Sequence, residues 1–396
     1  MKYDFENFNK RFNSGSGKWN EAKSFGVKES DDIIPFSVAD MEFSTAPEII
    51  EGLKQKIETT ILGYENPTPE YLETVCNWLK VRHNWNAKPE WILPSHGIVD
   101  AFFTAVKTYT NEGDGVMLMT PVYYPMYTAI KSTKRVLVDN KLIYNDGKYE
   151  IDFDDFERKA ADKNTKMLIL CSPHNPCGRV FTRQELSRIA EICLKNNVFV
   201  VSDEIHFDLI MPGHTHTVFA SLSDDVADNC IVCTAPSKTF NLAGLQTSNI
   251  FIPNPEHREK FLNALKLSNP NPKCNLLGYF ACEIAYKNCS QWLDEALNVI
   301  NTNKNIIENF VKQEFPEIKI TPLEGTYLMW LNCRGLSIGK NFKELERINH
   351  EEAKLFFDEG YIFGEQGEGF ERWNIACPTR YINDALERMK KTYRKY

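Results

Sequence analysis

The sequence lacks long hydrophobic runs, an excess of positive charge and a secretory leader pattern. No uninterrupted apolar segment approaches the roughly 20 residues that cross a bilayer, and the start, Met1–Phe5, lacks a charged stretch followed by an apolar core. The formal net charge of −8 argues against nucleic acid or an anionic membrane as the main partner. We therefore expect a cytoplasmic protein that acts on a small molecule.

Disulfide and metal-binding patterns are also missing. The 11 cysteines are odd in number and lie singly in apolar segments, as is typical of reduced, buried thiols. Cys230 and Cys233 form the one CxxC, but no second pair stands at zinc spacing. His214 and His216 lie in a Pro-Gly loop without nearby carboxylate or thiolate partners, so we expect them to be exposed. No metal site is predicted.

Helical and strand patterns alternate through the middle of the chain. The predicted helices cover 99–109, 125–131, 153–161 and 183–195, and the predicted strands cover 116–119, 136–138, 167–171, 198–202, 231–234 and 248–252. Alternation of this kind requires right-handed crossovers. It predicts an α/β fold with a largely parallel sheet and helices on both faces.

At 396 residues the chain is too long for one ordinary core, so at least two domains are expected. Residues 1–45 read as an irregular arm that contributes to a small domain, 46–289 as the large domain and 290–396 as a C-terminal small domain. An amphipathic segment that starts near Trp292 would bridge the two domains. The small domain is predicted to contain a strand at 327–331 and helices at 351–357 and 383–393.

Polar residues follow three of the predicted buried strands. Asn175 lies just beyond the strand at 167–171, Asp203 follows 198–202, and Lys238 follows 231–234. Taken singly, each has a simpler explanation as a turn residue, a helix cap or a surface lysine. In an open α/β sheet, however, the carboxyl ends of parallel strands form the ligand-binding edge, which makes Lys238 a candidate amine nucleophile.

Two further features complete a recognisable set. The turn at 94–99 opens a helix, where free backbone N–H groups favour a phosphate, and an aromatic pair at Tyr123 and Tyr124 follows another strand. A cofactor that needs a lysine for a Schiff base, a carboxylate against a ring nitrogen, a phosphate cradle and an aromatic stacking face is pyridoxal 5'-phosphate.

Six ordered motifs together carry a family resemblance. They are 38–43 (VADMEF), 121–125 (PVYYP), 172–178 (SPHNPCG), 202–206 (SDEIH), 237–246 (SKTFNLAGLQ) and 370–378 (FERWNIACP). With them the chain resembles the class I/II aminotransferase superfamily of fold type I, and within it the MalY/PatB branch of C-S lyases, or cystathionine β-lyases. The resemblance implies a mostly parallel sheet of the seven-stranded type in the large domain and a smaller α+β domain.

The resemblance also implies residue roles. Lys238 would form the Schiff base and act as general base, Asp203 would pair with the ring nitrogen, and Asn175 would hydrogen-bond the ring oxygen. Further contacts would come from Tyr123 (stacking), from Gly97, Ile98, Val99 and Ser237 (phosphate), from Tyr64 of the neighbouring subunit (phosphate), and from Arg372 with Asn175 (substrate carboxylate). A homodimer with shared active sites is thus implied.

Three positions depart from the wider superfamily. Gln246 stands where many members have an arginine eight residues after the lysine, which favours the C-S lyase branch. His206 stands where aspartate aminotransferases have a tyrosine, so it either replaces that cofactor contact or only caps the strand edge. Ser37 stands where the branch often has a tryptophan, so the shape of the side-chain pocket is open.

The leading hypothesis is β-elimination of cystathionine or another S-substituted L-cysteine to a thiol, pyruvate and ammonia. Transamination of an L-amino acid is the alternative, because the same carbanion can be reprotonated at the cofactor carbon. A cofactor-bearing regulatory or binding protein is a third possibility, although the full set of Lys238, Asp203, Asn175 and Arg372 disfavours pure binding.

Overall fold

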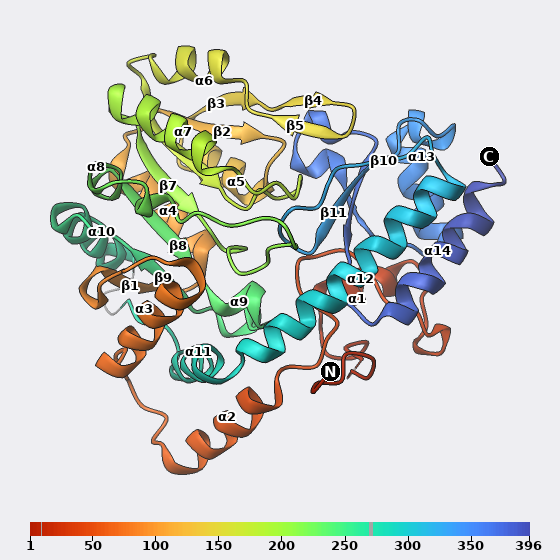
Figure 1. Cartoon of the computed structure of the whole chain (residues 1–396), viewed down its shortest axis with the longest axis horizontal. Helices are drawn as coiled ribbons and strands as arrows, with labels where there is room; N and C mark the ends of the chain where they lie inside the picture. Colours follow the sequence, from red (N-terminus) through yellow and green to blue (C-terminus); the bar gives the residue numbers. More distant parts are fainter. Residues whose placement is uncertain (9, 269–271) are drawn as a thin grey trace.

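Two β-sheets organise the chain in the computed structural model, which describes residues 1–8, 10–268 and 272–396. A seven-stranded sheet and its helices form one half of the molecule, and a four-stranded sheet forms the other half (Figure 1). Within the described residues, every helix is too short or too polar to cross a membrane.

The large sheet has the strand order β1-β9-β8-β7-β6-β2-β3. Its strands are β1 (Ile92–Ser95), β2 (Gly115–Thr120), β3 (Val136–Lys141), β6 (Thr165–Cys171), β7 (Phe199–Asp203), β8 (Cys230–Thr234) and β9 (Ser248–Phe251). The five adjacent strands β8, β7, β6, β2 and β3 run parallel to one another, as expected. The expected continuation of the parallel pattern into β9 was wrong. This strand is antiparallel to β8 and β1, because the link from Thr234 to Ser248 holds only short helices and no full crossover.

Strand residues are buried on both faces of the large sheet. In β2, Val116 and Leu118 pack into one hydrophobic cluster, whereas Met117 and Met119 pack into another on the opposite face. Successive side chains of a strand point to opposite faces, so a strand covered by helices on both sides reads as a continuous apolar run. This explains why the central strands were visible in the sequence.

The helices cover both faces of that sheet. Those of the large half are α2 (Pro47–Thr59), α3 (Pro69–His83), α4 (Ile98–Tyr109), α5 (Tyr124–Ser132), α6 (Phe153–Ala160), α7 (Arg183–Lys195), α8 (Asp224–Asp228), α9 (Pro236–Thr239), α10 (Pro255–Ser268) and α11 (Leu276–Asn288). Apolar residues of α4, α5 and α10 share one cluster, and those of α6 and α7 contribute to the other. The predicted two-sided α/β architecture is confirmed.

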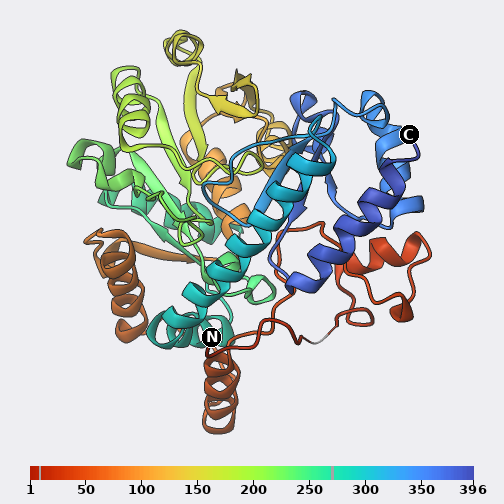
Figure 2. The same ribbon diagram turned by 45° about the vertical axis from the view of Figure 1, so that its right-hand side comes forward.

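The small sheet is wholly antiparallel, with the order β10-β11-β13-β12. Its strands are β10 (Lys319–Ile320), β11 (Leu328–Asn332), β12 (Asp358–Glu359) and β13 (Phe370–Asn374), and its helices are α13 (Phe342–Arg347) and α14 (Thr379–Tyr393). The long helix α12 (Ser290–Glu314) runs diagonally along the boundary between the halves, as Figure 2 shows.

Two segments tie the halves together. The N-terminal arm, which contains α1 (Gly17–Ser24), is anchored to β13, where Asn374 donates through Nδ2 to the carbonyls of Val38 and Asp40, both at 2.7 Å. The hairpin of β4 (Ile143–Asn145) and β5 (Lys148–Glu150) reaches β11, where Trp330 donates through Nε1 to the Tyr149 hydroxyl at 3.1 Å. Neither the hairpin nor α1 was predicted from the sequence.

The expected helix at 351–357 was wrong. A six-residue π-helix, Ile348–Ala353, ends at Lys354, whose φ of 52° is left-handed, and β12 follows at Asp358. Leu355, Phe356 and Phe357 are all buried, so this run packs on every side instead of presenting one helical face. Its backbone also pairs with the arm, since Phe36 donates its N–H to the Phe356 carbonyl at 2.8 Å. Tertiary packing has overridden the local pattern.

Candidate active site at the strand ends

One cavity of about 310 Å³ lies at the carboxyl ends of β6, β7 and β8, beside the N-terminus of α4. It brings together almost all of the candidate site residues. The lining includes Gly97, Ile98, Val99, Tyr123, Asn175, Asp203, His206, Ser237, Lys238 and Arg372. Tyr64 does not line it, and with 93% of its surface exposed it lies free in the loop after α2.

Lys238 enters the cavity from the next-to-last residue of α9. Pro236 opens this short helix, because its fixed φ suits the first helical turn. Nζ donates to the Ala39 carbonyl of the N-terminal arm at 2.6 Å, and the Tyr327 hydroxyl donates to the same carbonyl at 2.9 Å. Desolvation lowers the pKa of Lys238 to about 8, and the positive charge of Arg372 adds to this effect against the opposing carboxylates Asp40 and Asp203. An amine in this range can exchange a proton near neutral pH.

Asp203 ends β7 and is 3% exposed. Burial raises the pKa of its carboxyl group to about 7, and the neighbouring charge of Glu204 contributes in the same direction. One oxygen accepts the N–H of Ile205 at 3.2 Å, and no described cationic side chain forms an ion pair with it. The carboxylate is therefore held in the cavity without a protein counter-charge in contact.

Arg372 on β13 reaches the cavity from the small sheet. It is buried, and its guanidinium donates to the Asn175 side-chain oxygen at 3.0 Å and pairs with the Asp358 carboxylate of β12. Strand register explains the pair, because Asp358 and Arg372 stand directly opposite each other in the antiparallel ladder. Nε of Arg372 has no described hydrogen-bond partner, so the guanidinium keeps a donor for a further acceptor.

Residues 97–99, for which a phosphate cradle was predicted, form the N-terminus of α4. Gly97 precedes α4 with φ of 91°, a conformation that favours glycine, and no side chain caps the first-turn amides. Ser237, Gln246 and Thr247 lie around the same cavity. Exposed N–H groups at the positive end of a 12-residue helix suit an anion.

Tyr123 and His206 line the remaining walls. Burial raises the pKa of Tyr123, so the ring stays a neutral phenol that can stack on a planar group. His206 is also buried, and desolvation keeps its pKa well below the usual range, which makes it a neutral imidazole. Its Nδ1 has no described partner. Ser37 lies outside the cavity lining, and its hydroxyl donates to Glu21 at 3.2 Å.

A second polar layer behind the cavity was missed in the sequence. Glu204 accepts hydrogen bonds from the Ser202 hydroxyl and the Phe219 N–H, both at 2.9 Å, and lies 2.7 Å from Nε2 of His216. The expectation that His216 is exposed was therefore wrong, because the loop folds back onto a carboxylate 12 residues earlier in the chain. The adjacent acids Asp203 and Glu204 were a usable signal, since alternation sends their side chains to opposite faces.

Asp208 is the centre of the other part of this layer. Its carboxylate accepts from Nε1 of Trp78 at 3.1 Å and from the Thr239 hydroxyl at 2.8 Å, and it lies 2.7 Å from Nε2 of His83. Thr239 is the residue after Lys238, so Asp208 fixes the short helix that presents the lysine. Nothing in the local sequence marks Asp208 for this role.

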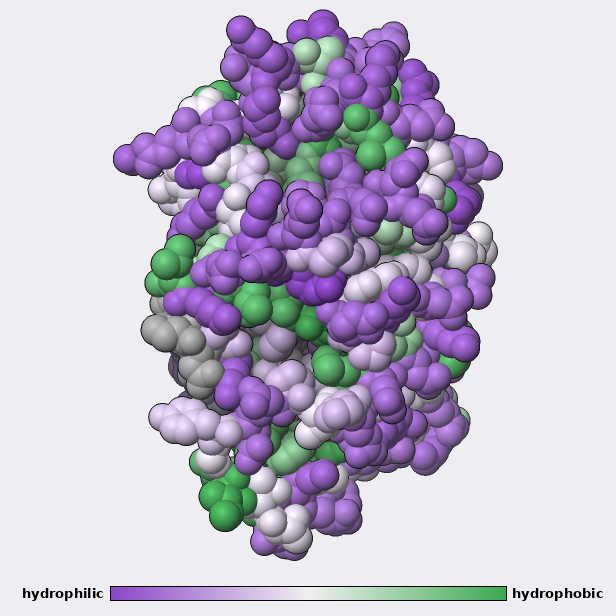
Figure 3. Space-filling view, turned by 90° about the vertical axis from the view of Figure 1, so that its left-hand side faces the viewer, coloured by the Kyte–Doolittle hydropathy of each residue, from purple (hydrophilic) through white to green (hydrophobic). Residues whose placement is uncertain are grey.

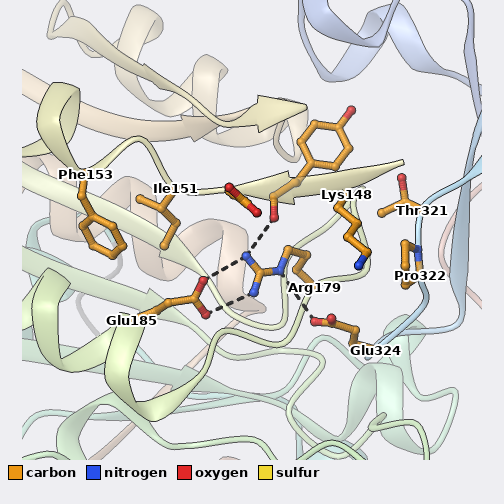
Figure 4. Close-up of a pocket in the computed structure, with 10 residues that line it drawn as sticks. Lys148, Ile151, Phe153, Arg179, Glu185, Thr321, Pro322 and Glu324 are labelled. Carbon is orange, nitrogen blue, oxygen red and sulfur yellow. Dashed lines mark hydrogen bonds and ion pairs between the residues drawn. The ribbon is translucent and has the colours of Figure 1, made fainter. Parts of the chain in front are cut away.

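A second cavity, of about 430 Å³, lies between the β5 hairpin strand, the start of α7 and the loop before β11. Figure 4 shows Arg179 at its centre. The guanidinium forms two bonds to the Glu185 carboxylate, at 3.0 and 3.1 Å, donates to the Tyr149 carbonyl at 2.9 Å, and lies 3.7 Å from Glu324. Its charges are thus paired within the protein.

The fold and the site together define a class. Residues 31–389 match the family model for class I and II aminotransferases, so the chain belongs to that family. It is 40% identical to cystathionine β-lyase PatB of Bacillus subtilis over 98% of this chain and 99% of that one. The expected family, and its MalY/PatB branch, are confirmed.

Solved structures agree with the sequence relatives. Cystalysin from Treponema denticola, a structure that contains pyridoxal 5'-phosphate, superposes with a TM-score of 0.97 at 47% identity and covers 100% of both chains. A pyridoxal-phosphate-bound C-S lyase from Staphylococcus hominis superposes with a TM-score of 0.90 at 29% identity, covering 99% of this chain and 98% of that one. The expected fold type I architecture is confirmed.

Proposed function

We propose that this chain is a pyridoxal-phosphate-dependent C-S β-lyase that cleaves cystathionine or another S-substituted L-cysteine. The observation that carries the proposal is the arrangement of Lys238, with its lowered pKa, and the buried carboxylate Asp203 around one cavity that Arg372 closes from the small sheet. The similarity to a cystathionine β-lyase and to two C-S lyase structures supports the choice of reaction.

The residues present fit this cofactor. Asp203 lacks a cation in contact, which suits a protonated ring nitrogen, since the opposite charges interact by roughly 4 kcal/mol at an intermediate effective dielectric. The uncapped N-terminus of α4 with Ser237 suits the phosphate, Tyr123 suits the ring face, and Asn175 suits the ring oxygen. Lys238 would hold the aldehyde carbon covalently through Nζ.

When bound, the cofactor supplies an electron sink for the substrate α-carbon. Arg372 would bind the substrate carboxylate with two N–H groups, with Asn175 at its side, and this orients the Cα–H bond toward Lys238. Once the substrate amine has taken the place of Nζ on the aldehyde carbon, the freed Nζ would take the Cα proton, which a neutral amine of depressed pKa can do at neutral pH. Asp358 would keep the Arg372 guanidinium in place during this step.

Elimination follows from the removed proton. The electron pair left at Cα forms the Cα–Cβ double bond while the Cβ–S bond breaks and the sulfur leaves as a thiolate. Proton transfer from Nζ would balance the charge on the leaving sulfur. The aminoacrylate product reacts with water to give pyruvate and ammonia, so no external oxidant or amino acceptor is consumed.

We further propose a homodimer in which Tyr64 reaches the partner's phosphate site. Tyr64 is almost wholly exposed, and it follows Ile61 and Leu62, which are also exposed, after the half-exposed Ile50 and Ile57 of α2. Figure 3 shows hydrophobic groups at the lower end of a mostly hydrophilic face, the end at which Figure 1 places α2. An exposed apolar patch of this kind favours a protein contact.

A product assay tests the reaction. Purified enzyme loaded with pyridoxal phosphate is incubated with L-cystathionine, with and without a 2-oxo acid, and pyruvate and free thiol are measured. We expect equal amounts of pyruvate and free thiol to form in the absence of the 2-oxo acid. A strict requirement for the 2-oxo acid, with no pyruvate from cystathionine, would replace the lyase by the aminotransferase alternative.

A further inference from the structure

The small sheet has two chemically distinct faces at β12 and β13. On one face, Asp358 pairs with Arg372 and belongs to the proposed substrate clamp. One residue along each strand, Glu359 stands directly opposite Glu371. Alternation sends this second pair to the other face, away from the cavity. Like charges directly opposite each other in a ladder are destabilising, so the pair requires compensation.

More acidic groups gather around that second pair. Glu371 is 3% exposed, and one of its oxygens has no described hydrogen-bond partner. Its other oxygen accepts a hydrogen bond from Nδ2 of Asn349 at 3.3 Å, and no described cationic side chain forms an ion pair with it. Among the described side chains, only Lys343 forms an ion pair with Glu346, at 2.9 Å. The negative charge of this group is thus incompletely balanced by the protein.

His350 lies inside this acidic group. It is 3% exposed and packs against the rings of Phe25 and Phe356, at centroid distances of 4.6 and 5.2 Å, and those two rings also contact each other. Its Nε2 is 3.0 Å from an oxygen of Glu359, yet the angle does not make a hydrogen bond, and both ring nitrogens lack described hydrogen-bond partners. A buried imidazole whose nitrogens form no hydrogen bond, and whose Nε2 faces a carboxylate, is a candidate ligand for a cation.

The donor atoms are close enough to share one ion. One ligand atom each from Glu346, His350 and Glu359 lies within 4.8 Å of the other two. A cation bound at about 2.0–2.2 Å accommodates donors up to about 4.4 Å apart, so small side-chain rotations close the site. The residues come from α13, the π-helix and β12, and π-helical turns are frequent at functional sites.

We propose that Glu346, His350 and Glu359 bind one divalent cation of the Zn²⁺ or Mn²⁺ type on the face of the small sheet opposite Arg372. One imidazole nitrogen with two carboxylates is a donor set that these ions accept, and the partly exposed Glu346 and Glu359 leave room for water ligands. The ion would add positive charge beside the Glu359–Glu371 pair and tie β12, which carries Asp358, to α13 and the π-helix. This site does not depend on the proposed reaction.

The experiment uses the chelator-treated holoenzyme and titrates it with ZnCl2 by calorimetry and with MnCl2 by electron paramagnetic resonance. Glu359→Gln and His350→Phe each remove one ligand, and the phenyl ring of the second variant keeps the ring contacts with Phe25 and Phe356. Glu344→Gln is the matched control, because it removes one carboxylate as Glu359→Gln does, but Glu344 pairs with Arg347 outside the cluster.

Wild type and Glu344→Gln are expected to bind one ion per chain and to gain thermal stability on its addition. Each ligand variant is expected to bind at least tenfold more weakly and to lose that stabilisation. The proposal is overturned if wild type takes up no stoichiometric ion, or if Glu359→Gln binds as wild type does. A further result would also overturn the proposal: Glu359→Gln raises the unfolding temperature of the metal-free protein, and wild type binds neither Zn²⁺ nor Mn²⁺. In that case a bound proton, and not a metal ion, would balance the carboxylates.

Discussion

The two cavities at the sheet edges differ in whether their charged side chains are paired with other groups of the protein. The Arg179 cavity is the larger, at about 430 Å³ against about 310 Å³, but its arginine is bound on several sides by Glu185, Glu324 and a backbone carbonyl. In the Lys238 cavity, Asp203 has no described ion-pair partner in contact and Lys238 has a lowered pKa.

We expect this difference to separate a structural cavity from a reactive one. A paired arginine has already used its donors within the fold, whereas an unpaired buried carboxylate and a desolvated amine remain free to interact with a bound molecule. Cavity size alone would select the wrong one. Three sets of substitutions test the contrast, from the largest expected effect to the smallest.

Lys238→Ala removes the amine that defines the reactive cavity. Pyruvate release from cystathionine is expected to fall about 10³-fold or more, because both the covalent attachment and the general base are lost. A pyruvate assay measures this loss, and absorbance spectra should show that the cofactor is no longer attached to the protein. Circular dichroism checks that the fold is kept. Pyruvate formation at the wild-type rate would refute the role of Lys238.

Asp203→Asn is expected to change activity and stability in opposite directions. Turnover should fall about 10²- to 10³-fold, because an amide cannot hold a charge against the ring nitrogen. The cofactor-free protein should become more stable above pH 7, by up to about 4 kcal/mol, since the folded pKa near 7 lies above the ordinary value of 3.8.

The sign of this stability effect follows from proton linkage. Between about pH 4 and pH 7 the folded state binds more protons at Asp203 than the unfolded state, so the stability of wild type falls as pH rises through that range. The asparagine side chain of the variant cannot titrate, and the gain from Asp203→Asn should therefore vanish near pH 4. Denaturant unfolding at about pH 4.5, 6 and 8 measures it, and an equal gain at all three values would contradict the raised pKa.

Arg372→Lys and Arg179→Lys make the same substitution in the two cavities. Arg372→Lys should raise KM for cystathionine about 10- to 100-fold, because a lysine cannot form the paired bonds to a carboxylate. Arg179→Lys should leave KM and kcat within about twofold and lower the unfolding free energy by about 1 kcal/mol, because it loosens a partly buried ion pair. Steady-state kinetics compares them, and equal KM values would abolish the distinction between the cavities.

The parts of the fold that the sequence predicted are those with strong local signals. Strands such as β2 and β6 are continuous apolar runs because helices cover both faces, and the polar residues at the strand ends identified Lys238, Asp203 and Asn175. The partners of these residues were less visible. Asp358 lies on a two-residue strand next to a stretch that reads as a helix, and its pairing with Arg372 depends on tertiary register.

The second polar layer was hidden for a similar reason. His216 and Asp208 look like ordinary loop residues, and their contacts with Glu204, His83 and Thr239 join segments that only the folded chain brings together. A pattern read along one segment has no information about such contacts, whereas the family motifs were readable because they are contiguous.

The hydrogen bonds to the Ala39 carbonyl determine when, during synthesis, the cofactor site can become complete. This carbonyl accepts from Lys238 and from Tyr327, and the arm that carries it is held by Asn374 on one of the last strands. A nascent chain that has emerged only through β9 already has the parallel strands and the lysine, but neither Tyr327 nor Arg372. Stable capture of the cofactor should therefore come after the small sheet has been synthesised and has folded.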